Sequence, residues 1–243
     1  MGDRDTLYSG QAGRPESFTF DERVANVFPD MIARSVPGYE LVLGMIGLLA
    51  DRHARAHTHI YDLGCSLGSV TAAMREAVQA EDVTFVAVDH SEPMVARCRE
   101  RLASGGPGGA SLRVELGDIR ETPIANASVV VLNLTLQFVP PADRLTLLQR
   151  IAAGMVDGGA LILVEKIRFD DPEEQRLQTL WHEAFKRARG YSELEIATKR
   201  TALENVLRPD TEAQHFDRMQ AAGFGAPLCW FRCFSFAGYL AFR

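Results

Sequence analysis

The N-terminal part of the chain is a polar stretch followed by apolar residues at helical spacing. Residues 1–19 are rich in glycine, serine and charge, which predicts an arm or loop. The apolar residues of the next segment recur at a helical period; they are Val24, Val27, Phe28, Met31 and Ile32. Pro29 predicts a kink or break in this helix, and Pro37-Gly38 predicts its end. A second helix is expected from about Glu40 to Ala54.

The middle of the chain alternates short apolar blocks with amphipathic segments. Strands are expected at 57–64, 83–90, 111–118, 128–138 and 160–169, and helices at 69–80, 92–103 and 142–155, the last ended by Asp157-Gly158-Gly159. The strands are apolar on both faces, which favours a parallel sheet covered by helices. Alternation of this kind is typical of a doubly wound, Rossmann-like α/β fold.

The C-terminal third departs from this alternation. Residues 170–208 predict a helical insert that covers the substrate or forms an oligomer surface. A further helix is expected at 211–224, and residues 226–236 and 238–243 predict an antiparallel hairpin at the sheet edge. We expect one domain over residues 1–243, with 1–54 as an N-terminal arm and helices.

Charge and cysteine usage narrow the functional classes. The net charge is −6, from 26 Lys and Arg against 32 Asp and Glu, and no dense basic run is present. Direct nucleic-acid binding is therefore not expected. The four cysteines are scattered without a CxxC pair, which suits a reducing cytoplasm. The N-terminus has no apolar signal core, and no apolar stretch is long enough to cross a membrane.

The most informative motif is YDLGCSLGS at residues 61–69, between a predicted strand and a predicted helix. Gly64 and Gly68 allow a tight turn and a close approach of the backbone to a ligand. Asp89 ends the next strand, 21 residues beyond Gly68, where an acidic ligand of a ribose is expected. This combination predicts a nucleoside site at the carboxyl ends of the strands; a tight turn with no ligand is the alternative.

The cofactor is suggested by what the turn lacks. Dinucleotide sites use G-x-G-x-x-G, whose second glycine meets a pyrophosphate, and Ser66 occupies that position here. A nucleoside without phosphate fits better, and S-adenosylmethionine is such a ligand. Asp118 and Asn133 end the third and fourth strands and face the same crevice, although a loop cap and a strand-end cap are alternatives for them. The histidines at 53, 57 and 59 are interpreted as a solvated helix end, so no metal is expected.

One other enzyme class matches the same motif. Gly64 to Gly68 also fits G-x-S-x-G, the nucleophile turn of α/β hydrolases, with Ser66 as nucleophile and His182 or His215 as base. Only one strand precedes the motif, and no HGGG-like segment lies upstream. The hydrolase hypothesis is therefore disfavoured.

Several segments resemble the carboxy-S-adenosylmethionine synthase family. They are FDERVANVFPDMIARSVPGY, YDLGCSLGS, NASVVVLNLTLQF, GYSELEI, KRTALENV and WFRCFSF. The resemblance implies a class I methyltransferase fold with a mostly parallel seven-stranded sheet. It also implies conversion of S-adenosylmethionine and prephenate to carboxy-S-adenosylmethionine, phenylpyruvate and water. The implied partners are a second copy in a homodimer and a downstream tRNA carboxymethyltransferase that uses the product at a wobble uridine.

The resemblance assigns ten residues to ligand contacts. They are Tyr39 at the cofactor, Gly64, Cys65 and Ser66 around its methionine part, Asp89 and His90 at the ribose, Asp118 and Ile119 at the adenine, Asn133 near the sulfonium, and Arg200 at the carboxylate. The family often has Asn where this chain has His90. Arg200 is the catalytic candidate, because a guanidinium clamps a carboxylate with two hydrogen bonds.

The prephenate pocket and the exact activity stay open at the level of sequence. Arg168, Lys166 and Lys199 are candidates for the prephenate carboxylates. A conventional methyltransferase acting on tRNA or a small acid is the first alternative activity. A nucleoside-binding protein without catalysis is the second.

Overall fold

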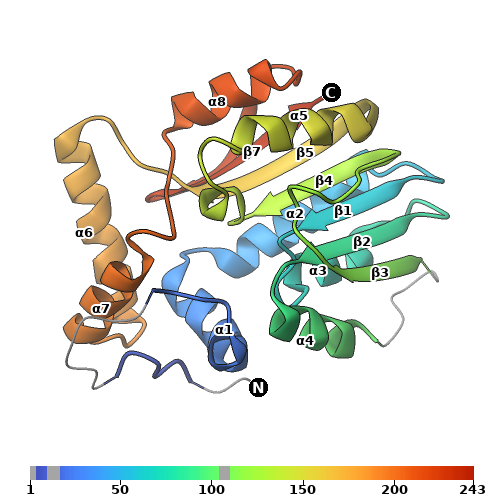
Figure 1. Cartoon of the computed structure of the whole chain (residues 1–243). Helices are drawn as coiled ribbons and strands as arrows, with labels where there is room; N and C mark the ends of the chain where they lie inside the picture. Colours follow the sequence, from blue (N-terminus) through green and yellow to red (C-terminus); the bar gives the residue numbers. More distant parts are fainter. Residues whose placement is uncertain (1–3, 10–16, 104–109) are drawn as a thin grey trace.

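A seven-stranded sheet forms the centre of the computed structural model, which describes residues 4–9, 17–103 and 110–243. Residues 1–3 and 10–16 of the predicted arm, and residues 104–109, lie outside the described residues. The strand order is β3-β2-β1-β4-β5-β7-β6; Figure 1 labels the strands from β3 to β7. The strands are β1 (His59–Leu63), β2 (Thr84–Asp89), β3 (Ser111–Leu116), β4 (Ala127–Asn133), β5 (Met155–Lys166), β6 (Leu228–Cys233) and β7 (Phe236–Phe242).

The strand directions confirm the predicted Rossmann-like class and the antiparallel C-terminal hairpin. Strands β1 to β5 pair in parallel, while β7 pairs antiparallel with both β5 and β6. The hairpin lies at the edge of the sheet as predicted, with β7 next to β5 and β6 as the outermost strand. The apolar residues of β7 are buried, as an interior strand requires.

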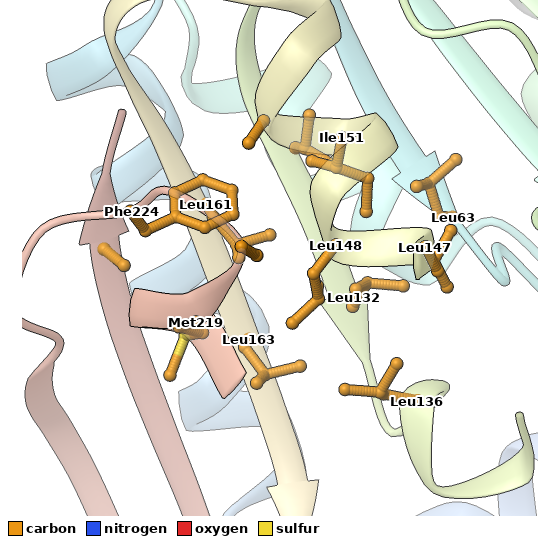
Figure 2. Packing of buried hydrophobic residues seen from close by; sticks show 14 of the residues in the cluster. Leu63, Leu132, Leu136, Leu147, Leu148, Ile151, Leu161, Leu163, Met219 and Phe224 are labelled. Carbon is orange, nitrogen blue, oxygen red and sulfur yellow. The ribbon is translucent and has the colours of Figure 1, made fainter. Parts of the chain in front are cut away.

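Helices cover both faces of the sheet. They are α1 (Glu22–Ser35), α2 (Tyr39–His53), α3 (Ser69–Ala77), α4 (Glu92–Leu102), α5 (Arg144–Gly154), α6 (Pro172–Ala188), α7 (Glu193–Leu203) and α8 (Glu212–Ala221). One face packs on α5 and α8 through a cluster that includes Leu132, Leu148 and Met219 (Figure 2). The opposite face packs on α2 and α3 through Ile46, Met74 and Val131. Because successive strand residues point to opposite faces, β4 contributes to both clusters.

Two predicted boundaries differ from the structure. Helix α1 continues through Pro29, so the predicted break is wrong. Strand β5 begins at Met155, directly after α5, whereas the sequence predicted that Asp157-Gly158-Gly159 would end the helix. Met155 pairs with Ala127, and the register then shifts before Ala160 pairs with Val129. The glycines therefore lie in an irregular part of the strand, a common position for glycine in sheets.

The predicted insert consists of α6 and α7, which lie beyond the ends at which the parallel strands finish (Figure 1). Each helix starts at a side-chain cap, Asp171 for α6 and Ser192 for α7. The N-terminal segment holds the insert: the Phe18 amide donates to the Ala202 carbonyl over 3.1 Å. Among the described helices, none alone is long and apolar enough to span a membrane; α1 and α2 meet that test only as a pair bent by 95°.

Candidate active site

A cavity of about 350 Å³ opens at the carboxyl ends of the parallel strands, where α1, α6 and α7 contribute to its wall. In doubly wound sheets this is the end at which ligands bind. Nine of the ten residues assigned from the sequence line it. They are Tyr39, Gly64, Cys65, Ser66, Asp89, His90, Asp118, Ile119 and Asn133. The tenth, Arg200, is not part of the lining.

The glycine turn after β1 is shaped by contacts within the protein. Gly64 and Gly68 have φ of 85° and 76°, in the region that glycine adopts at no steric cost. A Cβ atom on Gly64 would lie 2.4 Å from the Thr135 side chain, and one on Gly68 would lie 2.7 Å from the Cys98 sulfur. The two glycines therefore allow the β4 loop and α4 to approach the turn closely.

Asp89 at the end of β2 is fixed by two backbone donors. Its Oδ2 accepts from the Ser66 amide at 2.8 Å and its Oδ1 from the Ser91 amide at 2.9 Å. The side chain of Ser91 in turn caps α4 and donates to the Phe20 carbonyl at 2.6 Å. Each carboxylate oxygen keeps a lone pair. The arrangement suits a carboxylate that accepts hydrogen bonds from a ribose diol.

Asp62, at the end of β1, holds the first turn of α3. Its Oδ2 accepts from the Thr71 amide at 3.0 Å and from the Thr71 hydroxyl at 2.6 Å. Complete burial raises the pKa of Asp62 to about 7. Asp62 is not among the lining residues, so it positions the helix under the site.

The loop after β4 is fixed by Glu165, which the sequence analysis did not single out. Its carboxylate accepts from the amides of Thr135, Leu136 and Gln137 at 2.7–3.0 Å. Burial raises the pKa of Glu165 to about 8. At the start of this loop, the Oδ1 atom of Asn133 is buried with no hydrogen-bond partner within the described part of the chain. An orphaned acceptor that faces the cavity fits a ligand donor such as an ammonium group.

Asp118 lies where an adenine-binding acid is expected, and it is held by a neighbouring cation. Arg120 donates to both oxygens of Asp118 and also to Asp143 at 2.8 Å. The hydrogen bond from Arg120 is the main cause that lowers the pKa of Asp118. A fixed, ionised carboxylate remains able to accept from a ligand amine; its contact with adenine stays a prediction.

Arg200 faces away from the cavity in the single chain. Its side chain is 65% exposed and donates to Glu183 Oε1 on α6 at 2.7 Å. Its neighbour Lys199 points inward instead and lines the cavity. The predicted carboxylate clamp therefore needs a ligand or a chain that comes to Arg200 from outside this cavity wall.

The hydrolase hypothesis requires a Ser66–His pair, and the hydrogen bonds of the described residues do not form one. The Ser66 hydroxyl donates to the Met94 sulfur at 3.5 Å. His182 Nε2 is bonded to the Ser35 carbonyl at 2.8 Å, and the two ring nitrogens of His215 are buried without a hydrogen-bond partner in the part of the chain that the structure describes. The neighbouring Cys65 thiol has a pKa raised by a hydrogen bond with Cys98 and by burial, so it is held protonated.

An aromatic wall closes one side of the cavity, and the sequence analysis missed it. The Phe20 ring makes edge contacts with Phe18, Phe28 and Phe138, at centroid distances of 5.1, 6.2 and 5.3 Å. All four rings line the cavity. Such a wall excludes water and offers an apolar surface to a substrate ring.

Three lysines line the cavity, from β5 (Lys166), α6 (Lys186) and α7 (Lys199). Sequence reasoning named Lys166 and Lys199, but it also named Arg168 and missed Lys186. Arg168 is not in the lining and binds Asp170 and Gln214. The composition contained a signal that could have pointed to Lys186, because only three of the chain's 26 Lys and Arg residues are lysines.

Comparisons with known proteins identify the family of this chain. A family model described as a methyltransferase domain matches residues 60–159. Carboxy-S-adenosyl-L-methionine synthase from Geobacter metallireducens is 51% identical over 98% of both chains. The synthase of the same name from Vibrio cholerae is 49% identical over 100% of this chain and 98% of its own length. The chain belongs to the carboxy-S-adenosyl-L-methionine synthase family.

Solved structures show how widely this family's fold is shared. Human N-acetylserotonin methyltransferase, solved with S-adenosylmethionine, matches 91% of this chain and 55% of its own with a TM-score of 0.61 and 15% identity. An S-adenosylmethionine-dependent methyltransferase from Leishmania major matches 93% of this chain and 79% of its own, with a TM-score of 0.61 and 12% identity. At these identities the likeness establishes the class I methyltransferase fold of this synthase family member. The turn, Asp89 and Asn133 fit S-adenosylmethionine, and within the described residues no His, Cys, Asp and Glu group is arranged to hold a metal.

Proposed function

We propose that the protein converts S-adenosylmethionine and prephenate to carboxy-S-adenosylmethionine, phenylpyruvate and water in the cytoplasm. Prephenate loses carbon dioxide and hydroxide; the hydroxide takes a proton from the sulfonium methyl, and the resulting carbanion captures the carbon dioxide. The product then serves a tRNA carboxymethyltransferase at the wobble uridine. The observation that carries the proposal is identity of about half the residues to synthases over nearly the full length.

The architecture of the cavity supports the first substrate. Asp89, Asp118 and Asn133 end β2, β3 and β4 or lie just beyond them, so they form a row of polar groups along the sheet edge. Adjacent strands are about 4.8 Å apart, so β3 and β4, which are three spacings apart, span roughly 14 Å. This length suits a nucleoside whose sulfonium lies toward β4.

The chain's own residues would act by positioning and by excluding water. The turn at Gly64 and the loop held by Glu165 fix the backbone around the ligand. The wall around Phe20 keeps bulk water from the carbanion, which a water proton would quench. Holding the two substrates side by side replaces a bimolecular encounter, which accounts for large rate gains without covalent catalysis.

The direct test is to incubate the purified protein with S-adenosylmethionine and prephenate. We expect carboxy-S-adenosylmethionine and phenylpyruvate to appear in equal amounts, measured by mass spectrometry and ultraviolet absorbance. A sample without prephenate is the control. Unchanged S-adenosylmethionine, together with methyl transfer to an added tRNA or small acid, would replace the proposal with a conventional methyltransferase.

We also propose that the protein is a homodimer and that Arg200 binds the product carboxylate. Arg200 belongs to the insert expected at the dimer interface, where its exposed side chain is available to a partner chain. Arg200→Ala should weaken carboxy-S-adenosylmethionine binding about ten- to a hundredfold, the cost of a charged hydrogen bond. Calorimetry should show little change for S-adenosylmethionine. Equal losses for both ligands would contradict this role.

A further inference from the structure

The three lysines of this chain are all in one place. The other cationic side chains are arginines, yet each lysine lines the same cavity. A lysine ammonium is compact and flexible, whereas a guanidinium is a broad planar fork. Lysine therefore occurs in this chain only at the cavity.

The three side chains form one cluster centred on His182. Lys166 pairs in the sheet with Phe236, whose ring lies 5.1 Å from that of His182. Lys186 follows His182 by one helical turn of α6, and residues so spaced share a helix face. The Ser35 carbonyl binds His182 Nε2 at 2.8 Å, while the Ser35 hydroxyl accepts from Lys199 at 3.0 Å.

The positive charge of this cluster is only partly balanced. Asp5 accepts from Lys199 at 3.3 Å and is buried. Lys166 and Lys186 make no ammonium hydrogen bond or ion pair in the described ranges. The nearby carboxylate of Glu183 is bonded to Arg200 at 2.7 Å. Burial and the neighbouring lysines lower the pKa of Lys186 to about 7, and burial lowers that of Lys166. Two half-buried ammonium groups that line one cavity without a partner of their own favour an anion as ligand.

Resting on the proposed function, we propose that Lys166 and Lys186 form the subsite for the carboxylates of the second substrate, an organic dianion. Lys199 also lines the cavity, but its charge is already balanced by Asp5, so we do not assign it to the substrate carboxylates. Strand β5 lies next to β4 in the sheet, so a ligand at Lys166 is about 5 Å from the strand that bears Asn133. The substrate that releases carbon dioxide is thereby held beside the sulfonium.

The test uses Lys166→Gln and Lys186→Gln in the full-length protein, with Arg168→Gln as the matched control. Arg168 is two residues from Lys166 but lies outside the cavity. We expect each lysine variant to raise the KM for prephenate at least tenfold and to leave the dissociation constant for S-adenosylmethionine within about twofold. Arg168→Gln should change neither. Lys166→Arg and Lys186→Arg, which keep the charge, should recover part of the prephenate affinity, and melting curves confirm that each variant folds.

Two results would overturn this assignment. One is a prephenate KM that stays at the native value in both glutamine variants. The other is a loss confined to S-adenosylmethionine, which would assign the lysines to the carboxylate of its methionine part. If the native protein forms no product, calorimetry with prephenate separates the two ideas: binding that the lysine variants lose supports the subsite although the proposed activity fails.

Discussion

Asp89→Ala should weaken S-adenosylmethionine and carboxy-S-adenosylmethionine alike, by more than a hundredfold. The substitution removes the acceptor expected to bind the ribose and leaves the Ser66 and Ser91 amides without their partner. Each lost hydrogen bond to a charged group costs about 1.5–3 kcal/mol, and the Ser66 amide belongs to the turn that shapes the cofactor site. Calorimetry with both ligands measures the effect.

Asp89→Asn is the control for this prediction. The amide has the same shape and keeps one acceptor oxygen for one of the two backbone donors. We expect affinities between those of the native protein and the alanine variant, with an unchanged melting temperature. Native affinity in a folded Asp89→Ala protein would remove Asp89 from the ligand site.

Arg144→Met should lower stability more than any ligand-site change. Arg144 is 1% exposed and forms an ion pair with Asp210. It also donates to the carbonyls of Val139, Gln137 and Arg208, and so joins the cavity loop to the segment before α8. Breaking a buried ion pair typically costs about 3–5 kcal/mol. For a chain of this size the melting temperature should fall by roughly 6–20 °C.

Arg150→Met on the same helix is the matched comparison. Among the described residues, Arg150 makes one side-chain hydrogen bond, to the Thr122 carbonyl at 3.0 Å, so we expect a loss of about 1 kcal/mol. Denaturant unfolding of both variants gives the difference directly. Equal stability of the two proteins would show that the Asp210–Arg218 pair, at 2.8 Å, suffices to hold the segment.

The nucleoside half of the site was predictable from the sequence because its determinants are local. Each polar residue ends an apolar strand or follows it, and parallel strands end at the same edge of the sheet, so Asp89, Asp118 and Asn133 had to lie along that one edge. The glycine turn was also correctly placed. Its closest contacts, Thr135 and Cys98, were not predictable, because they depend on how the β4 loop and α4 pack.

The other half of the site depends on contacts between distant parts of the chain. Lys199 binds Asp5, which is 194 residues away in the sequence. His182 binds Ser35, which is 147 residues away. No periodicity relates such pairs, so the sequence did not predict which face of α7 points inward. The family resemblance assigned Arg200 to the product carboxylate, and Lys199 was one of three candidates for the prephenate carboxylates. The structure turns Lys199 to the cavity and Arg200 to solvent.

The placement of the lysines also determines where amine chemistry can occur on this molecule. Acylating dyes, amine-directed cross-linkers and enzymes that acetylate lysine all need an ammonium side chain, and this chain offers them only cavity residues. Its exterior cations are guanidinium groups, which do not react with such reagents at neutral pH. Apart from the α-amino group, covalent attachment through lysine would therefore occur where the substrates are proposed to bind.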